Sequence, residues 1–263
     1  MKANKAYFII VLGIFFAIFF TAQTYAEDHL ILDPSPNNLC DQASLQRGAK
    51  LYMNYCSGCH SLQYMRFDGM ANDIGIVDKD GKVLDKLVER NLNFVSDKVT
   101  DPLDVALPKK EAIAWFGVPP PDLSLVARSR GPNWLYTYLR SFYEDPSRPW
   151  GVNNVVFPEV SMPNVLQALQ GTQIATKKAI TVLDDKGHPY DKEVIDHLVL
   201  KTPGKLKKQE FDQAVTDIVN FLEYVGEPHK LERQKLGVWV VLFLILFTVF
   251  AYLLKREYWK DVD

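Results

Sequence analysis

The sequence is poor in cysteine and nearly balanced in charge. Its 263 residues include three cysteines, Cys40, Cys56 and Cys59, which is too few for a closed zinc site made of four cysteines. The formal net charge of −2 lacks the basic excess of a nucleic-acid-binding surface, so we expect no nucleic-acid partner. Low-complexity tracts and internal repeats are also missing. The composition, 48% hydrophobic and 24% charged, is that of an ordinary globular protein of one or two domains.

Two of the three cysteines belong to the segment Cys56-Ser57-Gly58-Cys59-His60. Two cysteines separated by two residues and followed by a histidine form the attachment signature of a c-type haem. The thiols add to the two vinyl groups of the porphyrin, and the spacing lets both sulfurs reach one porphyrin edge from a single helical turn. His60 is then the proximal iron ligand. A zinc half-site lacks further cysteines nearby, and a redox dithiol gives His60 no role.

The N-terminus has the pattern of an export signal. Lys2 and Lys5 precede an apolar run over residues 6–20, and small residues follow it, which suits cleavage before Glu27. Residues 1–26 are therefore predicted to be a signal peptide. The alternative is an uncleaved N-terminal anchor, since the run is only slightly short for a membrane span.

A second apolar run near the C-terminus predicts a transmembrane helix over residues 236–254. At about 1.5 Å per residue this uncharged run would be roughly 28 Å long, close to the thickness of a hydrocarbon core. Export by the signal peptide places the domain at 27–230 outside the cytoplasm and the basic tail at 255–263 inside it. The expected topology is an exported globular domain on one C-terminal anchor.

Helical periodicity predicts the frame of the domain. We expect a helix capped by Ser44 to run into the haem motif, with Gly48 permitting close approach of another helix. The apolar stripe over 208–225 predicts a second helix that packs on the first. The intervening segments are predicted by their patterns: a turn at 78–82, a helix over 84–92, an irregular stretch at 119–124 whose Asp122 caps the next helix, an aromatic helix at 134–142, a loop at 145–163, and a hairpin or irregular insertion at 179–200.

Met162 is the best candidate for the second axial ligand. It lies far from His60 in sequence, on a predicted loop beside Pro163, which can present a thioether across the ring. The rivals lie closer to the motif or in less suitable settings: Met53, Met65, Met70, His29, His188, His197 and His229. Arginines suit the haem propionates because a guanidinium stays charged when partly buried, and Arg128 and Arg130 are both available.

Three segments make the chain similar to a known family. They are CSGCHSLQYMRF at 56–67, WFGVPPPDLSLVARSRGPNWLYTYLRSFY at 115–143 and RPWGVNNVVFPEVSMPNVL at 148–166. Together with the C-terminal span, they resemble cytochrome c1, the anchored haem subunit of the cytochrome bc1 complex, in its proteobacterial form. The resemblance implies a mainly α, cytochrome c-like monohaem domain with long loop insertions and one C-terminal transmembrane helix.

The same resemblance implies the site and its use. One haem c is attached at Cys56 and Cys59, with His60 and Met162 as iron ligands and Arg130 on a propionate. Its role is one-electron transfer from the Rieske iron–sulfur protein to a cytochrome c, within a ubiquinol:cytochrome c oxidoreductase that also contains cytochrome b. We find no catalytic acid–base or nucleophile constellation, so any enzymatic activity belongs to the complex.

The implied location is the bacterial inner membrane, as a single-pass protein with its haem domain in the periplasm. The alternative is an anchored monohaem cytochrome c subunit of another respiratory complex. Asn164 and Gln167 stand where relatives often carry a histidine and a tryptophan, which touches neither predicted ligand.

Overall fold

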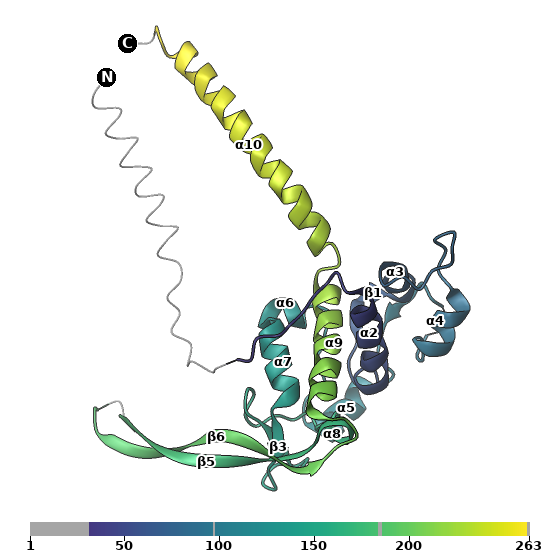
Figure 1. The fold of residues 1–263 in the computed structure, drawn as a ribbon, viewed down its shortest axis with the longest axis vertical. Helices are drawn as coiled ribbons and strands as arrows, with labels where there is room; N and C mark the ends of the chain where they lie inside the picture. Colours follow the sequence, from purple (N-terminus) through teal and green to yellow (C-terminus); the bar gives the residue numbers. More distant parts are fainter. Residues whose placement is uncertain (1–31, 97, 184–185, 262–263) are drawn as a thin grey trace. The chain divides into compact units, whose positions relative to one another are not determined.

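A computed structural model describes residues 32–96, 98–183 and 186–261. The helices and strands of the described residues belong to one compact unit, Asp33–Asp263. The predicted signal peptide at 1–26, its cleavage site before Glu27, and His29 lie outside the described residues. After the loop that begins this unit, helices form most of the regular structure, as the sequence predicts (Figure 1).

Three helices build the centre of the fold. They are α2 (Gln42–Tyr55), α7 (Pro132–Arg140) and α9 (Lys208–Gly226). Helix α9 lies between the other two and buries most of its residues, in agreement with the apolar stripe predicted over 208–225 (Figure 1). Burial of this stripe against two neighbours removes apolar surface from water and so stabilises the domain.

Helices α2 and α9 pack closely enough to require a glycine. A Cβ at Gly48 would lie 2.0 Å from the backbone oxygen of Asp217 and 2.7 Å from Cβ of Phe221. One turn further along α2, the ring of Tyr52 lies 5.7 Å from that of Phe221. The predicted packing of these two helices is confirmed, as is the role of Gly48.

The predicted cap of α2 is wrong. The side chain of Asp41 accepts a hydrogen bond from the backbone N–H of Ser44 at 3.0 Å, so Asp41 is the N-cap and α2 begins earlier than expected. The Ser44 hydroxyl instead donates to the buried Asp217 carboxylate on α9 at 2.7 Å. Arg47 donates to the same carboxylate at 2.7 and 2.9 Å. A buried carboxylate needs hydrogen-bond partners. Ser44, which the local pattern predicts as the cap of α2, is one of the partners of Asp217.

Short elements fill the region between the haem motif and α7. Strand β1 (Leu62–Arg66) pairs antiparallel with β2 (Pro102–Leu103). The helices here are α3 (Phe67–Asp73), α4 (Asp85–Asn91), α5 (Lys109–Phe116) and α6 (Val126–Arg130). Helix α4 and the turn around Gly81, closed by a Val77–Val83 bridge, confirm the predictions for 84–92 and 78–82.

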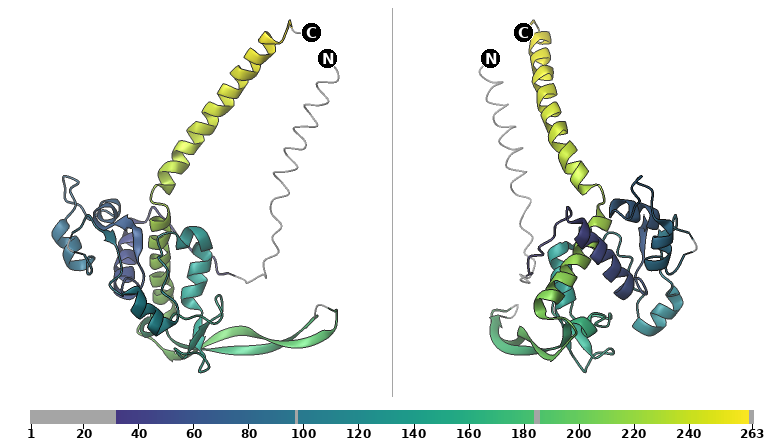
Figure 2. Two further views of the ribbon diagram at one scale, coloured as in Figure 1. Left: turned by 180° about the vertical axis from the view of Figure 1, so that it is seen from behind. Right: turned by 45° about the vertical axis from the view of Figure 1, so that its right-hand side comes forward.

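Two hairpins follow α7. Strands β3 (Phe142–Glu144) and β4 (Val152–Asn154) pair antiparallel, so the loop predicted over 145–163 is wrong at residues 152–154, which form β4. After α8 (Gln167–Gln170), strands β5 (Gly171–Leu183) and β6 (Pro189–Pro203) form a long ribbon, visible in Figure 2. The expected hairpin at 179–200 is thus longer than predicted. Sequence patterns missed its base because pairing between distant strands, rather than local alternation, defines it.

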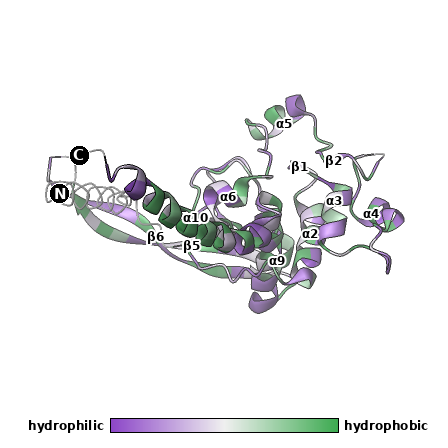
Figure 3. Ribbon diagram, turned by 90° about the horizontal axis from the view of Figure 1, so that it is seen from above, coloured by the Kyte–Doolittle hydropathy of each residue, from purple (hydrophilic) through white to green (hydrophobic). Residues whose placement is uncertain are grey.

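Helix α10 (Lys230–Tyr258) contains the predicted span at 236–254. It is long and apolar enough to cross a membrane, and none of its residues is buried by the protein. Figure 3 shows hydrophobic residues along its middle and hydrophilic residues toward its ends. An apolar helix that the protein does not cover needs an apolar medium, and the hydrocarbon core of a membrane is such a medium.

Candidate haem site

The haem motif continues α2 as a hydrogen-bonded turn. The N–H groups of Cys56 and Ser57 donate to the Tyr52 carbonyl, and His60 N–H donates to the carbonyl of Cys56 at 2.9 Å. The Tyr52 hydroxyl donates to the His60 carbonyl at 2.6 Å. The two thiols therefore leave the chain from one turn, as the spacing predicts, and the buried Tyr52 fixes where that turn ends.

The imidazole of His60 is oriented by the proline segment. Its Nδ1 lies 2.7 Å from the Pro121 carbonyl oxygen, and a carbonyl can only accept, so Nδ1 carries the proton. The other nitrogen, Nε2, is then free to bind a metal, which is the arrangement typical of ligating histidines. Burial lowers the pKa of His60, while the Pro121 hydrogen bond and the Asp122 charge act in the opposite direction.

Asp122 holds the proline segment against the strand that follows the motif. Its carboxylate accepts hydrogen bonds from the Ser61 hydroxyl at 2.7 Å and from the Gln63 N–H at 2.9 Å. It also accepts from the Ser124 N–H, but it does not cap α6, whose N-cap is Leu125. The predicted capping role is therefore wrong. The carboxylate is used across the fold because residues 61–63 offer it donors.

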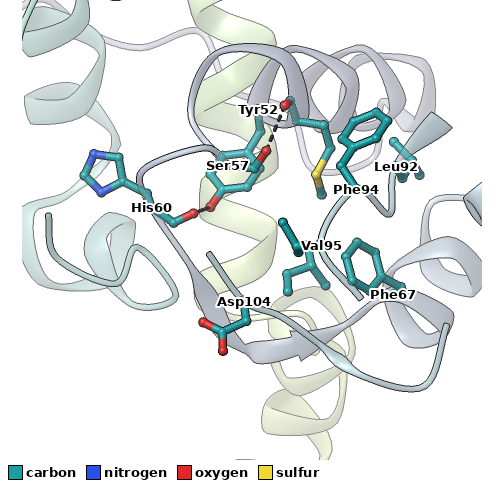
Figure 4. A pocket seen from close by; sticks show the side chains of 10 residues that line it. Tyr52, Ser57, His60, Phe67, Leu92, Phe94, Val95 and Asp104 are labelled. Carbon is teal, nitrogen blue, oxygen red and sulfur yellow. Dashed lines mark hydrogen bonds between the residues drawn. The ribbon is translucent and has the colours of Figure 1, made fainter. Parts of the chain in front are cut away.

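A small cavity lies on the other side of the motif turn. Its volume is about 10 Å³, which is the size of one water molecule, and its lining includes Phe67, Phe94 and Val95. Figure 4 shows the His60 imidazole pointing away from this cavity, while the His60 carbonyl faces Tyr52. The cavity is too small for a porphyrin, and the imidazole does not point into it.

The pKa of each of the two motif thiols is raised. Burial, helped by the neighbouring Cys59, raises the pKa of Cys56 to about 12, and burial also raises the pKa of Cys59. Both are therefore thiols at neutral pH, whereas catalytic dithiols have a lowered pKa. Within the described ranges no three His, Cys, Asp or Glu side chains gather to hold a metal ion, so a zinc site lacks its remaining ligands.

Met162 lies half-buried on a loop that several hydrogen bonds hold in place. The buried Asn154 accepts from the N–H groups of Val156 and Phe157. At Glu159, which has a positive φ of 62°, Arg148 binds the carbonyl and Asn153 the N–H. A left-handed glutamate persists only where its surroundings fix it. The segment 148–159 thus determines where the thioether is presented.

One side of this site is built by α6 and α7. The guanidinium carbon of Arg130 lies 5.2 Å from the Trp134 ring centroid, and Trp134 stacks on Tyr138 at 4.9 Å. The Tyr138 hydroxyl donates a hydrogen bond to Sδ of Met162 at 3.3 Å. Arg130 and Met162 therefore lie at the two ends of one chain of contacts.

Arg128 faces elsewhere. Its backbone lies next to Gly226 at the end of α9, and its charge acts on Glu227. Arg130, by contrast, lies over the Trp134 ring on α7. Of the two arginines, Arg130 is the one associated with the Met162 side.

The rival axial ligands have other surroundings. Met53, Met65 and Met70 are buried in the core. His197 lies on the ribbon beside Asp196 and Thr176, and the exposed His229 pairs with Glu232. His188 is an exposed residue near the turn of the ribbon. Met162 remains the half-buried, loop-borne ligand candidate that the sequence favours.

The structure groups the predicted site residues into two sets. Cys56, Cys59 and His60 share the turn after α2, while Met162 and Arg130 are joined through Trp134 and Tyr138. His60 and Met162 make no hydrogen bond to each other among the described residues. The donor set, two thiols on one turn, an imidazole with a free Nε2 and a thioether, fits a covalent haem with two axial ligands.

Sequence reasoning missed two residues of this arrangement, Tyr138 and Asn154. The four-residue spacing of Trp134 and Tyr138 within α7 is a signal that could have indicated a shared helix face. Asn154 carries no such signal, because its hydrogen bonds to Tyr138 and to the Met162 loop exist only after β3 and β4 pair.

The site and fold are consistent with a c-type cytochrome that has a C-terminal apolar helix. Comparison with known proteins narrows this class. The Cytochrome C1 family matches residues 34–262, and the chain belongs to that family.

Several curated proteins are similar to this chain over most of its length. Cytochrome c1 of Allochromatium vinosum is 50% identical over 232 residues, which cover 88% of this chain and 89% of that protein. A protein named ammonia monooxygenase gamma subunit, of Nitrosomonas europaea, is 42% identical over 88% of both chains. Cytochrome c1 of Rhodospirillum rubrum is 29% identical, with 84% of this chain and 83% of that one covered. The similarity to cytochrome c1 of proteobacterial type agrees with the resemblance deduced from the motifs.

Proposed function

We propose that the protein is the haem c electron-transfer subunit of a quinol:cytochrome c oxidoreductase of the bc1 type. It takes one electron from the Rieske iron–sulfur protein and passes it to a cytochrome c, beside a cytochrome b subunit. When bound, haem c supplies reversible one-electron chemistry at its iron. The protein attaches, orients and shields the group, and performs no acid–base catalysis of its own.

The residues divide this work among themselves. Cys56 and Cys59 hold the haem through thioether bonds, and His60 and Met162 are the axial ligands. A thioether opposite an imidazole raises the reduction potential, and two filled axial positions disfavour the binding of external ligands. Arg130 pairs with a propionate. Its support is the contact of Arg130 with Trp134 on the Met162 side.

The observation that carries the haem assignment is the contact between His60 Nδ1 and the Pro121 carbonyl at 2.7 Å. It fixes the tautomer, leaves Nε2 as a ligand and aims the ring from the turn that carries both thiols. Membership of the Cytochrome C1 family supports the electron-transfer role and the bc1 complex.

The proposed topology is a signal peptide at 1–26, a periplasmic domain at 27–230, a single span at 236–254 and a cytoplasmic tail at 255–263. The protein would then lie in the bacterial inner membrane. The length and hydropathy of α10 support the span. Basic residues flank it at both ends, so the orientation rests on the predicted signal peptide.

Met162→Leu tests the axial assignment. The variant should keep covalent haem, lower the midpoint potential by on the order of 0.1 V, within the range of about 0.8 V that axial ligands span, and bind carbon monoxide in its ferrous form. Met70→Leu, which changes a buried core methionine, is the control and should keep the wild-type potential. A Met162→Leu protein with an unchanged potential and no carbon monoxide binding would exclude Met162 as ligand.

One comparison favours a second candidate, an anchored monohaem cytochrome c subunit of another respiratory complex. The relative named ammonia monooxygenase gamma subunit is 42% identical to this chain. Purification of the tagged chain from detergent-solubilised membranes separates the two. Co-purification of a haem-containing cytochrome b and a Rieske protein supports the bc1 assignment, and a different set of partners supports the alternative.

A further inference from the structure

We propose that Tyr138 is a positioning residue for the axial thioether, and that its hydrogen bond to Met162 Sδ raises the reduction potential of the haem. The proposal rests on the proposed function, because it concerns a sulfur assigned as an iron ligand. It adds a residue outside the attachment motif and the ligand pair, and it gives that residue an electronic role.

The ring of Tyr138 is held on more than one side. It stacks on Trp134 at a centroid distance of 4.9 Å with the planes 9° apart, and it meets Phe142 edge-on at 5.2 Å. Only 9% of the residue is exposed. Ring contacts of this kind are favourable beyond the burial of their area, so the hydroxyl is held in one direction.

That direction is toward Met162. The hydroxyl lies 3.3 Å from Sδ, and within the part of the chain that the structure describes this is its one hydrogen bond. A buried phenol normally finds a partner, and sulfur is a weak acceptor compared with oxygen. The packing has therefore directed a strong donor to a weak acceptor that carries the proposed ligand function.

The backbone couples the two residues as well. The Asn154 side chain donates to the Tyr138 carbonyl at 2.8 Å and accepts from the first N–H groups of the Met162 loop. Helix α7 and the loop are thus joined at Asn154 as well as through the hydroxyl. With both ends held, the O–H and the sulfur keep their separation.

The electronic consequence follows from the two lone pairs of a thioether sulfur. One lone pair can bind iron while the other accepts the hydrogen bond from the phenol hydroxyl. A hydrogen bond draws electron density from sulfur and weakens its donation, which ferric iron needs more than ferrous iron does. The contact therefore favours the reduced state, as hydrogen bonds around a ligand commonly do when they tune a metal.

Tyr138→Phe removes the hydroxyl and keeps the ring. In the full-length, haem-loaded protein we expect about a threefold shift of the equilibrium toward ferric haem, which is about 28 mV lower at 59 mV per tenfold. Tyr136→Phe is the matched control. It removes a hydroxyl from the same helix, but this hydroxyl bonds to Thr216 and not to Met162. The change should therefore leave the potential unchanged.

A fluorinated tyrosine at position 138 gives a test of opposite sign. It keeps the shape and the hydroxyl, so the fold is retained, but it is a stronger donor and should raise the midpoint. Unchanged midpoints in both Tyr138 variants, or shifts no larger than that of Tyr136→Phe, overturn the proposal.

The failure of this proposal can be distinguished from failure of the proposed function. The charge-transfer absorption of methionine-ligated ferric haem reports the ligand in the wild-type protein. If it is present and the Tyr138 variants keep the wild-type midpoint, only the role of Tyr138 fails. If it is missing from the wild type, the Met162 assignment fails and this proposal fails with it.

Discussion

At the scale of single residues, two polar side chains have roles that differ from those that local sequence rules predict for them. Ser44 and Asp122 both have the chemistry of helix caps, but each makes its main hydrogen bonds to a distant segment. For the buried Ser44 the reason is that an unpaired buried polar group costs more than a helix end left to water, whereas the exposed Asp122 accepts from the donors that residues 61–63 place beside it. Such residues join the helices and loops that form the site.

Asp122→Asn should reveal this as a pH-dependent loss of stability. Burial opposes ionisation, but hydrogen bonds from Ser124, Gln63 and Ser61 outweigh it and lower the pKa of Asp122. A lowered pKa contributes stability above the unfolded-state value of about 3.9, and that contribution is lost as the pH falls through the folded-state value. Because Asp122 is exposed and solvent screens its interactions, we expect the variant to be only about 0.5 kcal/mol less stable at pH 7.

The measurement is urea denaturation of the haem-loaded wild type and variant at pH 7 and pH 3. The difference in unfolding free energy should be smaller at pH 3, where the wild-type carboxylate approaches protonation. An equal difference at both pH values would contradict the role of the charge. In a separate measurement, a shift of the NMR signals of the His60 imidazole in the variant would indicate that the Pro121 carbonyl has moved.

At the scale of elements, the close contact of α2 and α9 determines where the haem motif lies. The motif continues α2, so any change in the separation of the two helices moves the thiols and His60 relative to the rest of the site. Gly48 permits that contact, since a Cβ there would overlap the backbone of α9.

Gly48→Ala should therefore destabilise the domain by about 3 kcal/mol, because an inserted methyl group in a packed interface forces the backbone to move. The control is Gly69→Ala on α3, where a new Cβ would meet no atom within 4 Å. That change should be neutral or stabilising by up to about 1 kcal/mol, as expected when alanine replaces a helical glycine. Thermal unfolding followed by haem absorbance compares the two, and equal stabilities would contradict the packing argument.

At the scale of the whole molecule, the globular part and α10 are stabilised by different surroundings. The residues of α9 are mostly buried by the protein, whereas those of α10 are mostly exposed. One helix is stabilised by packing and the other requires an apolar medium. The domain is thus expected to keep its fold and haem when the anchor is removed.

Truncation before Lys230 tests this division. The shortened protein should leave the membrane fraction, appear in the periplasmic extract, and retain its covalent haem with a wild-type absorption spectrum. Haem staining of the two fractions after electrophoresis measures the outcome. Retention in the membrane would contradict a single C-terminal anchor and would favour an uncleaved segment at 6–20, which N-terminal sequencing would then detect.

The sequence by itself determined the features that depend on covalent spacing and on periodicity. Cysteines two residues apart, a histidine next to them, the stripe of α9 and the apolar run of α10 are local patterns with local consequences. The haem motif, the Met162 candidate and the helical character of the domain could therefore be predicted before the fold was known.

Only the tertiary structure decided which distant groups meet. It gave Asp41 rather than Ser44 the cap of α2, joined Asp122 to residues 61–63, and brought Tyr138 to the sulfur of Met162. These contacts join residues far apart along the chain, or depend on which of several polar groups is buried. Their free energies are set by burial and geometry in the folded state, which no local pattern of residues encodes.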